Sequence, residues 1–264
     1  MTGTAPSMGA IEQFWRAIWE TEGHMNNENQ WIKEVEDQLR MKVQEPHIPQ
    51  LLELHNWKKI VMKRKNWTGP GPDGVQNYWI TKITVLWHME IAAIRKLQKG
   101  VSAVPEWLGE GRTVLIPKSN DRTQVDKYRP ITCLNTLYKV LTAVIAQDIQ
   151  MFLTSNKMWD NQQKGTQRRI LGTVDNLIVD RAVLEECKQY ERNLAVAYFD
   201  YEKAYDSIPH EWQIKCFQMC QINNNVIQIL RQLHSIWRTK YESMRKCKEV
   251  GGYNSKEGSF RVIH

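Results

Sequence analysis

Cysteine is scarce in this sequence, and long apolar runs are missing altogether. Five cysteines are an odd number and provide no disulfide framework. Cys216 and Cys220 lie four residues apart without paired histidines or cysteines elsewhere, which favours core thiols over zinc ligands. No uncharged apolar run approaches the length of a membrane span, and no secretory signal is visible at the start. We therefore expect an intracellular protein, nuclear or cytoplasmic, with no membrane partner.

Acidic residues are fewer than basic ones. The chain carries 36 Lys and Arg against 29 Asp and Glu, a net charge of +7. This excess suits an anionic partner such as a nucleic acid. Two clusters, at 58–65 and 238–248, concentrate the positive charge. For either cluster alone, a solvated helix face or a nuclear-import signal explains the charge as well as phosphate contact does.

Apolar periodicity predicts a chain rich in helices. Steps of three and four residues predict helices at 11–19 and 31–39, a long helix over 75–100, and another over 134–152. Residues 1–50 are interpreted as an amino-terminal extension whose two helices pack on the next domain. Its first ten residues are expected to be disordered.

Two extended segments predict a β-hairpin with a long tip. Residues 112–117 and 128–131 bracket a polar stretch. Alternation along an extended strand directs Arg112 and Lys118 to one face, and Arg129 lies on the partner strand. Planar guanidinium groups and a mobile ammonium suit a triphosphate. Surface charge that protects an edge strand is the alternative.

Residues 69–74 are too rich in glycine and proline for regular structure and predict a shaped loop. Lys63, Arg64, Lys65 and Trp67 precede it. Such a loop lets backbone amides approach a phosphate while the indole stacks on a base. A plain domain joint has the same composition.

An apolar run ends abruptly in a carboxylate at residue 200. Residues 194–199 are short, apolar and uncharged, which predicts a buried strand. Asp200 then lies at the end of a rigid element, a suitable place for an oxygen ligand of Mg²⁺ in phosphoryl transfer. A turn or cap before Glu211 is the alternative.

Several blocks, in order, resemble the reverse transcriptases of non-LTR (LINE-type) retrotransposons. Residues 199–210, Phe-Asp-Tyr-Glu-Lys-Ala-Tyr-Asp-Ser-Ile-Pro-His, resemble the first catalytic palm motif. Four further segments resemble other blocks of this family: residues 116–118 and 128–131 in the fingers, residues 66–74 ahead of the fingers, and residues 162–165 between fingers and palm. The resemblance covers roughly residues 55 to 264.

The resemblance implies roles for individual residues. In this family the aspartate at the position of Asp200 binds the catalytic Mg²⁺ ions. Tyr201 assists through its backbone, and the ring of Tyr205 excludes a 2′-OH by its bulk. Basic residues at the positions of Arg112, Lys118 and Arg129 line the phosphates of the incoming nucleotide, and the segment with Lys63, Arg64, Lys65 and Trp67 lies on the template side.

The sequence lacks the motifs that follow in the family. A Gln-Gly helix and an aromatic-Ala-Asp-Asp hairpin, which supply the other metal-binding carboxylates, do not occur. Residues 259–264 resemble the strand that leads into the Gln-Gly block. Asp206, six residues from Asp200 across a turn, has no reason to reach the same ion. We therefore expect the chain to be catalytically incomplete as written.

Together these observations predict a helix-rich α/β (α+β) fold of the right-hand polymerase type. It comprises an extension at 1–50, a fingers-like region at 51–190 and a partial palm with an incomplete sheet at 191–264. The expected function is that of a fragment of an RNA-directed DNA polymerase, with an RNA template, a DNA primer, a deoxynucleoside triphosphate and Mg²⁺. Two alternatives stay open: a non-catalytic RNA-binding fragment, and a helical interaction protein that uses the Trp15 and Trp19 face.

Overall fold

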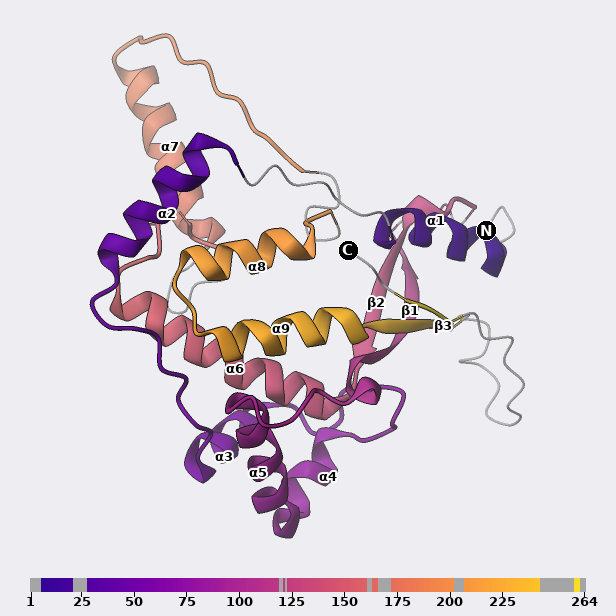
Figure 1. The fold of residues 1–264 in the computed structure, drawn as a ribbon. Coiled ribbons are helices and arrows are strands. Elements are labelled where there is room, and N and C mark those ends of the chain that lie inside the picture. The colour runs from indigo at the N-terminus through magenta and orange to yellow at the C-terminus, as the bar shows by residue number, and fades with distance from the viewer. Residues whose placement is uncertain are drawn as a thin grey trace.

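The structure is rich in helices, and a small sheet lies at one side of them (Figure 1). The computed structural model describes residues 6–20, 28–118, 121, 123–160, 163–165, 172–201, 207–242 and 259–261. The helix-rich α/β character predicted from the sequence is confirmed. None of the helices in these ranges has both the length and the hydropathy that a membrane span requires.

The helices are α1 (Met8–Trp19), α2 (Gln30–Lys42), α3 (Leu54–Lys63), α4 (Asn77–Lys82), α5 (Trp87–Gln98), α6 (Thr136–Ser155), α7 (Thr173–Gln189), α8 (His210–Met219) and α9 (Asn224–Ile236). Short 3₁₀ turns are η1 (Thr84–Leu86), η2 (Glu106–Gly109) and η3 (Val125–Lys127). The strands are β1 (Glu110–Pro117), β2 (Tyr128–Leu134), β3 (Arg238–Glu242) and β4 (Ser259–Arg261).

The two amino-terminal helices are present as predicted, but α1 begins earlier than expected. The Ser7 side chain accepts a hydrogen bond from the backbone N–H of Ala10 and so caps the first turn. Residues 8–10, expected to be disordered, are therefore helical. The prediction missed this cap because it judged the segment by composition alone.

The long helix predicted over 75–100 is interrupted. Its two parts, α4 and α5, are separated at Ile83, whose ψ of 65° is not helical, and by the turn η1. Ile83, Thr84 and Val85 are consecutive β-branched residues, which lose side-chain freedom in a helix. The predicted end is correct, because Gly100 adopts a positive φ of 69° immediately after the last turn.

The four strands form one sheet in the order β2-β1-β3-β4. The predicted hairpin is confirmed: β1 pairs antiparallel with β2, and Ile116 lies opposite Arg129. On its other side β1 pairs in parallel with β3, a contact between distant parts of the chain that local patterns did not indicate. Thr113 ties the three strands together, because its Oγ1 lies 2.6 Å from Oγ1 of both Thr132 and Thr239.

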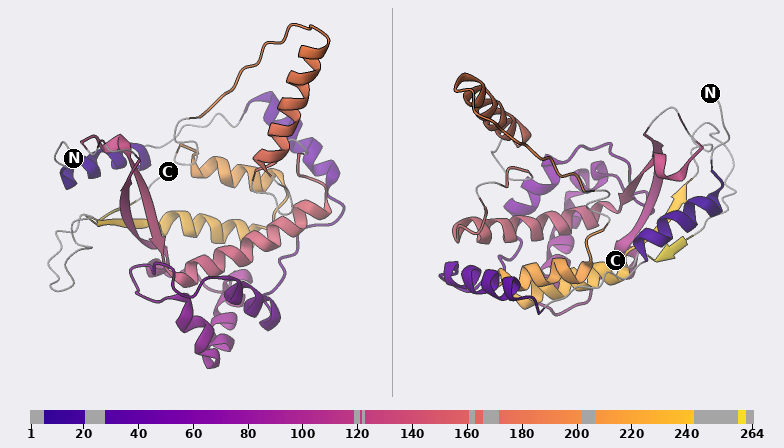
Figure 2. Two further views of the ribbon diagram at one scale, coloured as in Figure 1. Left: turned by 180° about the vertical axis from the view of Figure 1, so that it is seen from behind. Right: turned by 90° about the horizontal axis from the view of Figure 1, so that it is seen from above.

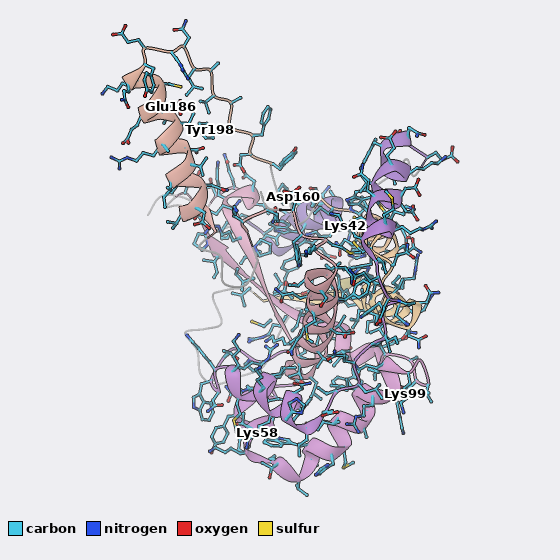
Figure 3. The ribbon with its side chains drawn as sticks, turned by 90° about the vertical axis from the view of Figure 1, so that its left-hand side faces the viewer. Lys42, Lys58, Lys99, Asp160, Glu186 and Tyr198 are labelled. Atoms are coloured by element: carbon cyan, nitrogen blue, oxygen red, sulfur yellow. The ribbon has the colours of Figure 1, made fainter. Side chains whose placement is uncertain are left out.

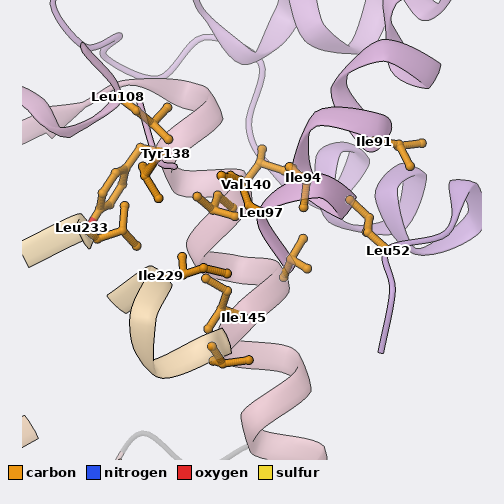
Figure 4. Packing of buried hydrophobic residues seen from close by; sticks show 14 of the residues in the cluster. Leu52, Ile91, Ile94, Leu97, Leu108, Tyr138, Val140, Ile145, Ile229 and Leu233 are labelled. Atoms are coloured by element: carbon orange, nitrogen blue, oxygen red, sulfur yellow. The ribbon is translucent and has the colours of Figure 1, made fainter. Parts of the chain in front are cut away.

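The main hydrophobic core is built from helices. Trp57 and Val61 of α3, Val140 and Leu141 of α6, and Leu233 of α9 are almost completely buried in it. Figure 4 shows side chains from α5, α6 and α9 meeting there. Burying an aliphatic side chain of this size stabilises a fold by about 1.5–3 kcal/mol.

A second, smaller core joins α1 to the sheet (Figure 2). Trp15 and Trp19 pack against Leu115, Tyr128 and Tyr241. The Trp19 and Tyr241 rings are stacked, with centroids 6.1 Å apart and planes inclined by 5°. Trp15 and Trp19 are thus buried within the chain. This argues against the alternative of a helical interaction protein that binds a partner through these two side chains.

Helix α7 projects from the rest of the molecule (Figures 1 and 2), and none of its side chains is buried. The buried strand predicted at 194–199 is wrong for this structure. Residues 192–201 have no regular structure, and Phe199 is 87% exposed. The run is apolar, but in the described part of the chain no strand pairs with it.

Candidate nucleic-acid interface

One face of the hairpin, here called the open face, lies opposite the face that packs against α1 and carries basic residues. The buried residues of β1, Gly111, Thr113 and Leu115, alternate with less buried ones. Arg112 therefore projects to the side away from the α1 core. Arg129 lies opposite Ile116 and shares this open face, while Lys240 of β3 lies beside Arg112 in the parallel register. The structure thus brings Arg112 and Arg129 to one surface, and it adds Lys240, which sequence reasoning missed because the β1–β3 pairing is not local.

Lys118 lies at the hairpin tip. Its backbone N–H donates to the Lys127 carbonyl oxygen at 2.7 Å, and its Nζ donates to the Asp126 carbonyl oxygen at 3.1 Å. The ammonium group is therefore held by the tip. A ligand of the open face that also used Lys118 would have to replace the second bond.

Asp200 and Tyr201 lie on the exposed segment that leads from α7 back toward α8. Within the described residues Asp200 forms no hydrogen bond or ion pair with Arg112, Lys118 or Arg129. The predicted nucleotide-site residue Tyr205 lies outside the described residues, as does Asp206.

The family resemblance implies a Mg²⁺ site. A Mg²⁺ ion prefers several oxygen ligands in octahedral geometry. In the part of the chain that the structure describes, no group of three acidic, histidine or cysteine side chains gathers around a common point, and Asp200 is exposed. These residues do not fit the ion.

The glycine- and proline-rich loop packs tightly against the start of α6. A Cβ atom on Gly71 would lie 2.2 Å from Asn135 Oδ1, so only glycine fits. The Asn135 side chain accepts from the N–H of Asp73 at 3.3 Å and donates to the Trp107 carbonyl oxygen at 2.7 Å. The predicted irregular loop is confirmed. Asn135, which follows β2, links the loop to Trp107, which precedes β1.

The basic residues ahead of this loop divide into two kinds. Lys63 and Lys65 are exposed. Arg64 is half-buried, and its Nη2 donates to the Lys139 carbonyl oxygen. Burial lowers the pKa of Arg64. Burial is also the largest cause that lowers the pKa of Lys139, whose Nζ donates to the Gly69 carbonyl oxygen at 3.3 Å. Arg64 thus holds the loop in place, while the two lysines are available to solvent.

Trp67 belongs to an exposed aromatic cluster. Its ring stacks on Tyr78 with centroids 4.6 Å apart and an interplanar angle of 18°. Trp79 meets Tyr78 edge to face at 5.2 Å, and Lys82 Nζ lies 5.8 Å from the Tyr78 centroid. Trp67 remains 67% exposed. Sequence reasoning assigned Tyr78 and Trp79 to a helix pattern, although two adjacent aromatics beside a basic run were a usable signal.

The family model "Reverse transcriptase (RNA-dependent DNA polymerase)" matches residues 116–256, which is more than half of the chain. The chain belongs to the reverse transcriptase family.

Three curated relatives agree with this assignment. The chain is 28% identical over 143 residues to the Retrovirus-related Pol polyprotein from type-2 retrotransposable element R2DM of Drosophila melanogaster, covering 54% of this chain and 13% of that protein. It is 25% identical over 121 residues to the uncharacterised 149 kDa protein of transposon TX1 of Xenopus laevis, and this match covers 46% of this chain and 9% of that protein. It is 27% identical over 112 residues to the Retrovirus-related Pol polyprotein from type-1 retrotransposable element R2 of Popillia japonica, and this match covers 42% of this chain and 15% of that protein.

The chain thus spans between 9% and 15% of the length of these relatives. The resemblance to non-LTR retrotransposon reverse transcriptases, first drawn from short motifs, is confirmed.

Proposed function

We propose that this chain is the fingers and first palm portion of a retrotransposon reverse transcriptase, and that it binds a template strand and an incoming nucleotide. The reaction of the whole protein is RNA-templated DNA synthesis on a DNA primer from deoxynucleoside triphosphates. The family match carries the assignment, and the open basic face of β1 and β2 supports it. In this proposal residues 51–190 are the fingers-like region, residues 191–264 are the partial palm, and residues 1–50 are an extension.

The nucleotide part of the proposal uses the hairpin. The guanidinium groups of Arg112 and Arg129 are planar forks that match phosphate oxygens two at a time. Lys118 adds a positive charge at the tip, where its Nζ exchanges the Asp126 carbonyl oxygen for a phosphate oxygen. Asp200 is assigned to the catalytic carboxylate position because of its motif, and Tyr201 and Tyr205 to the sugar side. The chemistry proposed here for this portion is binding and orientation of the triphosphate.

The template part uses the segment ahead of the loop. Lys63 and Lys65 are exposed at the end of α3, and Trp67 offers the ring face that Tyr78 does not cover. Phosphate contacts from the lysines and base stacking on the indole are the usual way in which proteins hold single strands without reading sequence.

A cross-linking experiment tests the nucleotide site. A photoreactive deoxynucleoside triphosphate should label the hairpin of the intact chain, and Arg129→Ala should reduce labelling about tenfold. Arg129→Lys should restore only part of it, because lysine keeps the charge but loses the fork. The matched control is Arg181→Ala on α7, an exposed arginine that forms an ion pair with Glu185. Equal labelling of all variants would refute the nucleotide site.

A further inference from the structure

A hollow of about 420 Å³ lies beside α5, away from the hairpin and the aromatic cluster. Four of its lining residues are basic or histidine side chains. The residues that line it include Leu54, His88, Ala92, Arg95, Lys96 and Lys99.

The spacing of these residues puts them on one side of α5. Positions 88, 92, 95 or 96, and 99 follow the helical repeat, so the side chains form a row along the helix. From His88 to Lys99 the row is about 16 Å long at the rise of an α-helix. Ala92 lies in the middle, and its single methyl group leaves the space that larger side chains would fill.

Arg95 is fixed in position. It is partly buried, and its Nε donates to the Leu52 carbonyl oxygen at 2.6 Å. A guanidinium group has five N–H donors, so this bond leaves the two terminal nitrogens of Arg95 for a ligand. Lys96 and Lys99 are exposed and add two mobile charges. A planar fork held between mobile charges is a suitable arrangement for phosphate oxygens.

Among the described residues, no acidic side chain lines the hollow. Glu53, the acidic residue next to Leu54, pairs with His55, whose Nδ1 lies 3.1 Å from the Glu53 carboxylate. On α5 itself Glu90 is the acidic residue of the first turn, and burial raises its pKa.

We propose that this hollow binds the phosphate backbone of a nucleic-acid strand at a site separate from Lys63–Trp67. Leu54 begins α3 and Lys63 ends it, so the two sites lie at opposite ends of a helix about 15 Å long. Figure 3 shows Lys99, which follows α5 at one end of the row, and Lys58 in the middle of α3. A row of about 16 Å suits consecutive phosphates better than a single anion. The inference rests on the proposed nucleic-acid binding of the chain.

The test measures the affinity of the full chain for a fluorescent single-stranded RNA across a salt series. The double variant Lys96→Ala/Lys99→Ala should bind about tenfold more weakly at low salt, and its log–log salt slope should fall by about 1.4, or 0.7 per contact. Ala92→Glu, which puts a carboxylate inside the hollow, should weaken binding at least as much. The matched control is Lys33→Ala/Lys42→Ala on α2, two exposed lysines whose removal should change neither quantity by a comparable amount.

The outcomes separate the two proposals. Wild-type affinity and slope in both α5 variants, together with weaker binding by Lys63→Ala/Lys65→Ala, would overturn the second site and leave the proposed function standing. No RNA binding by the unaltered chain would overturn both. If inorganic phosphate protects Lys96 and Lys99 from acetylation while RNA does not, the hollow takes a free anion and the strand assignment is wrong.

Discussion

At the scale of single residues, the closest backbone approach in the candidate interface is made by Gly71. Its hydrogen faces Asn135, which bonds both the loop and the turn before β1. A methyl group there would displace Asn135 and leave its amide partners unsatisfied. The loop therefore depends on this glycine for space rather than for an unusual φ.

We expect Gly71→Ala to lower the free energy of unfolding by about 1–3 kcal/mol, because the added Cβ overlaps backbone and side-chain atoms of Asn135. Urea denaturation followed by circular dichroism measures this. Gly9→Ala is the matched control. Gly9 lies inside α1 with nothing within 4 Å of a built Cβ, so alanine there should stabilise the helix slightly. Equal stability of the two variants would contradict the close approach.

We expect the protonation of His234, a partly buried residue of α9, to depend on folding. Its ring stacks on His210 at 4.0 Å and lies 5.1 Å from Trp237. Burial lowers the pKa of His234 to about 4; Glu211 opposes this shift and Arg231 adds to it. The unfolded chain therefore binds this proton more readily than the folded chain does.

We expect His234 to destabilise the fold as the pH falls from about 6.5 to about 4, because only the unfolded state gains the proton in that range. Above this window the effect is absent. The measurement is the urea midpoint between pH 7 and pH 4.5 for the unaltered chain and for His234→Asn. The variant should show a shallower dependence; parallel curves would mean that His234 titrates normally in the folded chain.

At the scale of elements, α1 acts as a cover for one face of the sheet. Its tryptophans fill the space between Leu115, Tyr128 and Tyr241, and the opposite face of the hairpin is left to Arg112 and Arg129. The position of the basic face thus depends on a helix that contributes no charge to it.

Trp15→Ala should cost about 3–5 kcal/mol of stability, since this side chain is 2% exposed in the small core. Hydrogen exchange should accelerate in β1 and β3, while α3 and α6 in the main core keep their protection. Trp31→Ala is a control of the same type on α2, where the ring is 52% exposed. Uniform loss of protection across both cores would show that α1 is not a separate unit of stability.

The aromatic cluster and the lysines beside it should affect RNA binding in different ways. Trp67→Ala should weaken the binding of single-stranded RNA by about 1–3 kcal/mol with an unchanged salt slope, because stacking releases no counterions. Lys63→Ala/Lys65→Ala should flatten the slope. Fluorescence anisotropy at several salt concentrations gives both values. A change of slope in Trp67→Ala would argue against stacking.

At the scale of the whole molecule, the described residues contain no cluster of carboxylates for metal catalysis. We expect the isolated 264-residue chain not to extend a primer on an RNA template with Mg²⁺ or Mn²⁺. Primer-extension gels with labelled deoxynucleotides test this. Template-dependent incorporation that disappears in Asp200→Ala would show that the chain holds a complete centre.

Local patterns predicted the parts of the fold that local interactions determine. The helices at 11–19 and 31–39, the hairpin and the loop at 69–74 follow from periodicity and from turn residues. The β1–β3 pairing did not follow, because it joins distant segments. The strand expected at 194–199 failed for a different reason. Apolarity shows that a segment gains by burial, but it does not show that the same chain provides the burying surface.

The same principle limits what could be said of the candidate site. The hairpin that carries Arg112 and Arg129 on one face was predicted because hairpin pairing is local, whereas their role at a nucleotide site stays a prediction. Other features of the site depend on how separate helices and strands pack together, and residue spacing in the sequence does not show this packing. They are the stacking of Tyr78 on Trp67, the position of Lys240 beside Arg112 and the hollow beside α5.

The parallel pairing of β1 with β3 also sets an order of events during synthesis on the ribosome. The β1–β2 hairpin can close as soon as its two strands emerge, but Tyr241 is made much later, and Trp19 stacks on it only then. At usual rates of translation the delay is on the order of ten seconds. During this interval Trp19 lacks its stacking partner on the nascent chain, so we expect α1 to be a segment that a chaperone can bind.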